Sequence, residues 1–87
     1  MDRFAPSRAV ACAVRAYMID DLTQTIAELR VAISIGRAMS LSHTECRNAV
    51  THEFLLRLHA SVYDRDDSAS IIDKARDQIA EHFPTLN

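Results

Sequence analysis

The sequence predicts an all-α fold, a compact bundle of three or four helices that assembles as a homodimer. It contains a single Gly, whereas a β-sheet needs glycine in its tight turns, and it is rich in Ala, which is depleted in strands. Apolar residues make up 48% of the 87 residues and recur once per helical turn over most of the chain. Residues 1–87 are therefore expected to form a single helical domain.

A first helix is expected to have its body at residues 8–19, with Pro6 and Ser7 leading into it. Asp20 and Asp21 then interrupt the pattern, and the apolar stripe that follows is rotated by roughly a third of a turn. We expect a break and a new helix capped by Asp21, with one kinked helix as the alternative. The two stripes consist of Val10, Val14, Tyr17 and Met18, and of Leu22, Ile26, Leu29 and Ile33.

The segment at residues 31–35 is apolar on both sides of the predicted second helix. A surface helix needs only one apolar face, so this segment is expected either at the centre of the bundle or at an interface. Because a core of this size gives marginal stability, a second copy would add buried surface, and Val31 and Ile35 are expected at the homodimer contact. A short β-strand is the alternative, since the run is β-branched, although no second strand is available to pair with it.

A turn is expected at residues 36–41, followed by the clearest helix start in the chain. Ser42 precedes Glu45 by three positions, which is the spacing of a capping box. The helix that begins there is expected to continue to about Tyr63. Its core-facing residues are expected to be Cys46, Val50, Phe54, Leu55, Leu58 and Val62, and its outward residues Glu45, Asn48, His52 and His59.

The polar and acidic residues 64–68 predict a loop whose last members cap a final helix, which Pro84 ends. On one side of this helix, Asp73, Asp77 and Glu81 follow one another at near-helical spacing. This acidic face is either a contact for a basic partner or a solubilising surface. The apolar stripe of the helix consists of Ile72, Ala75, Ile79 and Phe83.

No metal or cofactor site is predicted. His52 and Glu53 resemble the start of a zinc-protease helix, but Leu56 stands where the second His ligand is required. Residues 64–70 alternate acidic and hydroxyl side chains as a calcium loop does, but Ala69 replaces the Gly that such loops need for their sharp turn. Both segments are therefore expected to be solvated polar surface.

No enzymatic activity is predicted either. The best pairing of a nucleophile with a base is Cys46 with His43, three positions before it, but no second acid or glycine-rich loop supports it. Cys12 and Cys46 fit no metal-ligand spacing. In a reducing compartment they are expected to be free thiols that behave as small hydrophobes.

Residues 35–58 support an alternative interpretation. A short helix, a Ser-Leu-Ser turn at residues 40–42 and a second helix with apolar anchors such as Cys46 and Val50 follow one another there. This spacing is similar to the helix-turn-helix of LuxR-type regulators. The resemblance implies a DNA-binding transcriptional regulator whose second helix enters the major groove and reads bases with its first polar residues. In this sequence, those residues are His43, Thr44, Arg47 and Asn48.

Charge and hydropathy decide which interpretation leads. The formal net charge of −2 gives the molecule no overall attraction to phosphate backbones or anionic lipid, so nucleic acid is a less favoured partner. No apolar run approaches the roughly 18 residues of a membrane span, so we expect a cytoplasmic protein without a membrane contact. The leading prediction is a non-enzymatic protein–protein interaction module, a regulator, adaptor or inhibitor of another protein, that forms a homodimer.

Overall fold

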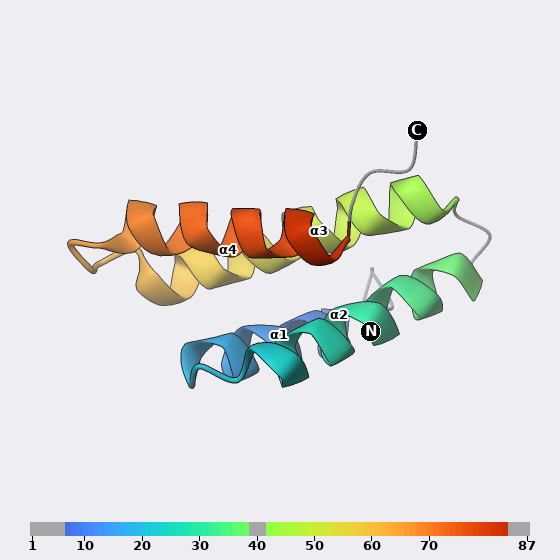
Figure 1. The fold of residues 1–87 in the computed structure, drawn as a ribbon, viewed down its shortest axis with the longest axis horizontal. Helices are drawn as coiled ribbons and strands as arrows, with labels where there is room; N and C mark the ends of the chain where they lie inside the picture. Colours follow the sequence, from blue (N-terminus) through green and yellow to red (C-terminus); the bar gives the residue numbers. More distant parts are fainter. Residues whose placement is uncertain (1–6, 39–41, 84–87) are drawn as a thin grey trace.

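The computed structural model describes residues 7–38 and 42–83, which fold into four α-helices (Figure 1). The predicted all-α fold is confirmed. These described residues contain no strand, so the alternative of a strand at residues 31–35 is wrong, and the homodimer stays a prediction. The helices are α1 (Ser7–Met18), α2 (Leu22–Ala38), α3 (His43–Val62) and α4 (Ser68–His82).

The helices form two antiparallel hairpins, α1 with α2 and α3 with α4, which lie on top of each other as two layers (Figure 1). α3 is the central helix, because it packs closely against α1, α2 and α4. By contrast, α2 and α4 make little close backbone contact, although both lie on the near side of Figure 1. The resulting bundle is flattened, with extents of 39 × 34 × 19 Å.

The core lies where the apolar stripes of the helices meet around α3. Its largest fully buried side chains are those of Phe54 and Leu58 from α3, together with Leu29 from α2. Tyr17 of α1 packs edge-on against the Phe54 ring, with the ring centroids 5.9 Å apart. α1 and α2 pack closely because their buried faces are rich in small residues, which are Ala9, Ala13, Ala16, Ala32 and Gly36.

The break between α1 and α2 is confirmed at the two aspartates. Asp20 has a φ of 61°, in the left-handed region. The Asp21 amide donates to the Ala16 carbonyl at 3.0 Å, and the Asp20 amide donates to that of Tyr17 at 3.1 Å. These two bonds form a Schellman motif, which ends α1. Asp21 then caps α2 as predicted, because its carboxylate accepts a hydrogen bond from the Gln24 amide at 3.1 Å.

The predicted start of α3 is confirmed, whereas α2 continues further than expected. The Ser42 hydroxyl accepts a hydrogen bond from the Glu45 amide at 3.1 Å. Gly36 is buried inside α2, which continues to Ala38, so the predicted turn at residue 36 is wrong. Close packing around this glycine offsets its poor helix propensity. The rest of the predicted turn, residues 39–41, lies outside the described residues.

The predicted core stripes are confirmed except at Met18, which is 41% exposed. It is the last residue of α1 and lines a depression that is open to solvent. Leu55, Ile72 and Phe83 are partly buried and pack against the core. The four residues expected to face outward from α3, Glu45, Asn48, His52 and His59, are exposed.

α4 is the least buried helix, with only Ala75 and Ile79 buried. Asp67 stands at its N-cap position, but the predicted side-chain cap is wrong. The Asp67 carboxylate instead accepts two hydrogen bonds from the Arg65 guanidinium, each 3.0 Å long, and such bidentate pairing satisfies both of its oxygens. At the other end, Arg47 of α3 donates to the Phe83 carbonyl at 3.1 Å, which fastens the end of α4 to α3.

Replacing Phe54 tests the core. Phe54→Ala is expected to lower the free energy of unfolding by about 3–5 kcal/mol, because it leaves a cavity at the centre of α3's contacts. Urea denaturation followed by circular dichroism measures this loss. Leu56→Ala, which truncates a side chain on the same helix that is 54% exposed, is expected to cost less than about 1 kcal/mol. Equal losses in the two variants would contradict the assigned core.

The left-handed residue at the end of α1 gives a second test. Asp20→Gly is expected to raise the free energy of unfolding by about 0.5–1 kcal/mol, because glycine adopts a positive φ without the strain that a Cβ brings. Asp20→Ala removes the same charge but keeps the Cβ, and it should show no such gain. The thermal unfolding midpoints of the two variants are compared with that of the wild type. An equal rise in both would contradict the prediction, because the gain would then come from removal of the negative charge and not from relief of backbone strain.

Candidate functional site

The two residues predicted at the homodimer contact lie on the outer face of α2. Val31 is 47% exposed, and Ile35 is partly buried. With Arg30, Ser34 and Ala38 they line a shallow depression that is open to solvent. On the opposite side of this segment, Ala32 and Ile33 are buried in the core, whereas an interface on the side of Val31 stays a prediction.

The acidic residues of α4 form an exposed face. Asp73, Asp77 and Glu81 are all exposed. Asp73 accepts a hydrogen bond from the Arg76 guanidinium at 3.1 Å, but both side chains lie largely in solvent. An ion pair in that setting contributes little to stability, so this face is available to solvent or to a partner.

The residues that the helix-turn-helix resemblance assigned to DNA lie at the start of α3. Thr44 and Asn48 are exposed, whereas His43 and Arg47 are partly buried. The Arg47 guanidinium is occupied twice, because it donates to the Phe83 carbonyl at 3.1 Å and to Asn48 Oδ1 at 2.8 Å. Its contacts therefore hold α3 and α4 together.

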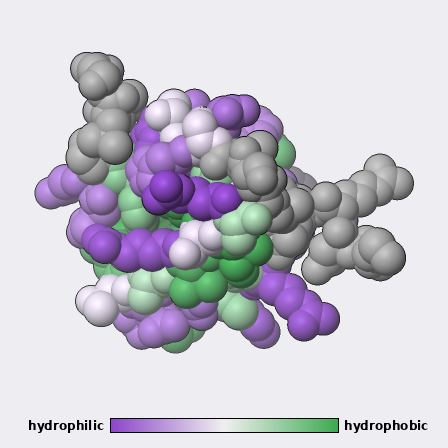
Figure 2. Space-filling model, turned by 90° about the vertical axis from the view of Figure 1, so that its right-hand side faces the viewer, coloured by the Kyte–Doolittle hydropathy of each residue, from purple (hydrophilic) through white to green (hydrophobic). Residues whose placement is uncertain are grey.

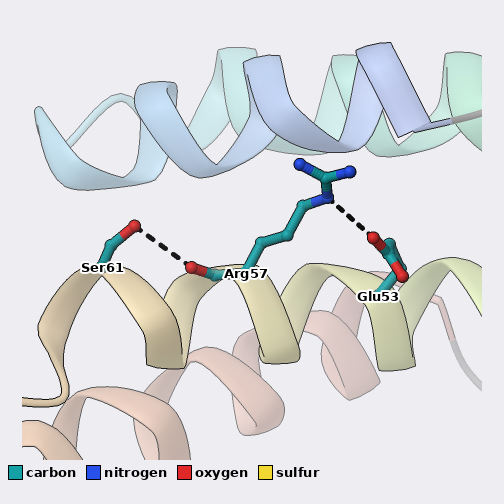
Figure 3. A network of polar contacts seen from close by, with 3 residues as sticks. All are labelled: Glu53, Arg57 and Ser61. Carbon is teal, nitrogen blue, oxygen red and sulfur yellow. Dashed lines mark hydrogen bonds and ion pairs between the residues drawn. The ribbon is translucent and has the colours of Figure 1, made fainter.

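The other arginine of α3 is also paired within the chain. Arg57 Nε donates to Glu53 Oε2 at 2.7 Å, one helical turn earlier, and its carbonyl accepts a hydrogen bond from the Ser61 hydroxyl at 3.1 Å (Figure 3). Its side chain lies on the side of α3 that faces α1 (Figure 3). Arg57 thus belongs to the contact between the two layers.

A surface that the sequence did not predict lies between α2 and α4. Three consecutive depressions, which we call the α2–α4 groove, share lining residues. Leu22 lines the first and the second, and Arg30 and His82 line both the second and the third. The groove therefore continues from the turn after α1 to the end of α4. The only part of the groove that the sequence could indicate is the pair Arg30 and Arg37, which lie seven positions apart on one face of α2. The opposite wall of the groove comes from α4, which is distant in the sequence.

The third depression has two arginines and two histidines around a partly apolar floor. It has a volume of about 390 Å³ and is lined by Arg30, Arg37, His43 and His82 around Ile33, Ser34 and Phe83. The Arg30 guanidinium lies over the Phe83 ring, 5.7 Å from its centroid, a distance suited to a cation–π contact. Figure 2, which views the end of the molecule where α2 meets α3, shows a hydrophobic area bordered by hydrophilic side chains.

Two residues that line the first depression form a hydrogen bond between α1 and α4. The Tyr17 hydroxyl donates to Gln78 Oε1 at 2.7 Å. Burial raises the pKa of the Tyr17 phenol, and the nearby Asp20 carboxylate raises it further, because both disfavour the phenolate. Lys74 and Arg65 line the same depression.

The described residues show no arrangement for metal chemistry. Within residues 7–38 and 42–83, no group of three or more His, Cys, Asp or Glu side chains lies close enough to hold a metal ion. Cys12 and Cys46 are free thiols, as predicted, but only Cys46 is buried, whereas Cys12 is partly buried. None of the four described helices is both long enough and apolar enough to cross a membrane.

Comparisons of this chain with models of known protein families, with curated proteins and with solved structures found no match.

Because the pKa of Tyr17 is raised, we expect the protein to lose stability at alkaline pH. The pKa of this phenol is raised in the folded state, so the neutral form favours folding below the ordinary tyrosine pKa of about 10, and this contribution is lost as the pH rises through the folded value. Urea unfolding between about pH 9 and 11 should show a shallower decline for Tyr17→Phe than for the wild type. Tyr63→Phe, which removes an exposed phenol, is the control and should keep the wild-type slope. Identical slopes in all three proteins would contradict the assignment.

Proposed function

We propose that this chain is a small non-enzymatic interaction module, a cytoplasmic regulator, adaptor or inhibitor of another protein, and that it acts as a homodimer. The observation that carries the proposal is the outer face of α2. Val31 remains 47% exposed beside Ile35, although the opposite side of the same helix is buried in the core. Apolar surface of this kind gains free energy when a partner removes it from water.

The shape of this face favours a second helix as its partner. Ser34 and Ala38 lie beside Val31 and Ile35, and their small side chains let another helix approach closely. A twofold axis would place α2 of one copy against α2 of the other, so that the same residues meet from both sides. The added burial would support a domain whose own core is small.

The acidic face of α4 is a second candidate contact, for a basic partner. Its residues Asp73, Asp77 and Glu81 are exposed, and it lies on a helix that contributes little to the core. Acidic patches of this kind act mainly on association rates and specificity. Charge reversal at Asp73 and Asp77 should slow the association of such a partner, and an unchanged on-rate would leave the face with a solubilising role only.

DNA binding is the second candidate function, and one observation favours it. Arg37, His43 and Arg47 gather where α2 ends and α3 begins. One observation favours the interaction module instead. The guanidinium of Arg47 already donates hydrogen bonds to the Phe83 carbonyl and to Asn48.

The oligomeric state tests the proposed homodimer. Size exclusion with light scattering at micromolar concentration should give about twice the 9.8 kDa mass of one chain. Val31→Asp should shift the mass to that of a monomer without loss of helicity, because the side chain is exposed in one copy. Leu56→Asp introduces the same charge at a similarly exposed apolar residue on α3 and should leave the dimer intact. A monomeric wild type, or dissociation caused equally by both variants, would overturn the homodimer.

A mobility-shift assay with DNA fragments separates the two functions. At low salt, weak retention through the cations near α3 is expected, and it should vanish at moderate salt because it is electrostatic. A sequence-specific complex that survives moderate salt and is lost in Asn48→Ala would replace the interaction module by the DNA-binding function.

A further inference from the structure

We propose that the α2–α4 groove binds an acidic amphipathic helix from a partner protein. This inference rests on the proposed function as an interaction module, and it names the chemistry of the partner and the surface that receives it. Three properties of the groove carry it: its length, its apolar floor and the sign of its charges.

The length of the groove matches a single helix. α2 and α4 each pack against α3 but make little close backbone contact with each other, and the depressions between them open to solvent. The groove follows α2 from Leu22 to Arg37, a rise of about 22 Å at 1.5 Å per residue. A helix of about four turns would therefore fill it.

The floor of the groove offers apolar surface that the fold leaves uncovered. Leu22 from α2, Ile71 from α4 and Phe83 directly after α4 pack against the core but are only partly buried. A helix with apolar residues at every third or fourth position would cover them, which is how amphipathic helices bind in hydrophobic grooves. The exposed remainder of these side chains thus supplies the hydrophobic part of the binding free energy.

The charges that line the groove select an acidic partner. The whole chain has 12 acidic residues against 10 basic ones. The groove nevertheless is lined by Arg30, Arg37, Lys74 and the imidazole of His82, with Asp20 as the carboxylate among its lining residues. The acidic residues Asp73, Asp77 and Glu81 of α4 are exposed and are not among the lining residues of the groove. Such complementarity steers an acidic helix to the groove and disfavours a basic one.

Fluorescence anisotropy with synthetic peptides tests the proposal on the full chain. The probe is a labelled peptide of about 15 residues, with Leu along one helical face and Glu on its flanks. It should bind in the micromolar range, and Arg30→Glu with Arg37→Glu should weaken binding by about tenfold or more. Arg30→Gln with Arg37→Gln keeps good helix formers in place and should weaken binding in the same direction, which guards against a folding defect.

The matched control is Arg8→Glu with Arg15→Glu, which makes the same change in net charge on exposed residues of α1. It should alter binding by less than about twofold. An equal loss in this control would overturn the proposal, since only the overall charge would matter. Equal binding of a peptide with Lys flanks, or of a Glu peptide with Ser in place of Leu, would overturn it as well.

Competition identifies other occupants. Displacement of the peptide by vesicles that contain phosphatidylserine, or by duplex DNA at lower concentration, would assign the groove to a membrane surface or to nucleic acid and overturn the proposal. The peptide-binding test can be distinguished from the homodimer test. Val31→Asp is expected to change the mass of the assembly, and Val31 does not line the groove. A dimer that fails to bind the acidic peptide overturns the groove proposal alone, and a monomer that binds the peptide overturns the homodimer alone.

Discussion

Burial of the apolar stripe of α3 is the constraint on which the rest of the structure depends. Cys46, Val50, Phe54, Leu58 and Val62 follow one another every four residues along this helix, and all are buried. α3 is the helix that packs closely against each of the other three. The hairpin of α1 and α2 presents mainly small residues to its own interface, so without α3 it would have little surface to bury. The bundle is thus organised around one element.

This organisation determines which surfaces remain for partners. Because α4 packs mainly on α3, only Ala75 and Ile79 are buried in it, and its edge facing α2 stays open as the α2–α4 groove. Because α2 packs on α1 and α3, its outer face with Val31 and Ile35 is covered by no other helix among residues 7–38 and 42–83. The two proposed contacts, one for a second copy and one for an acidic helix, adjoin each other on α2, because Arg30 and Ser34 line both depressions. Val31 and Ile35 line only the first, and Arg37 and Phe83 line only the second.

The local features of the fold were predictable from the sequence, and the features that join distant segments were not. Periodicity and the residues Asp21 and Ser42 sufficed to place the helices and two of their caps, since these depend on neighbours within one turn. The errors at Gly36 and Asp67 arose because packing and the Arg65 side chain competed with local preferences.

Among the candidate surfaces, those formed by a single helix could likewise be predicted from the sequence, whereas the one formed by two helices could not. The exposure of Val31 and of the acidic face of α4 could be inferred from one helix at a time. The α2–α4 groove could not, because Arg30 and Phe83 meet only in the folded chain. For the same reason, local spacing around residues 35–58 could not reveal that Arg47 holds the end of α4.

Amide hydrogen exchange, resolved by residue, tests the central place of α3 most directly. If α3 organises the bundle, the amides around Phe54 and Leu58 should exchange slowest, at the rate set by global unfolding, while those of α4 exchange faster through local opening. Protection in α4 equal to that in α3 would contradict the account, since α4 would then be as firmly held as the helix on which it is said to depend.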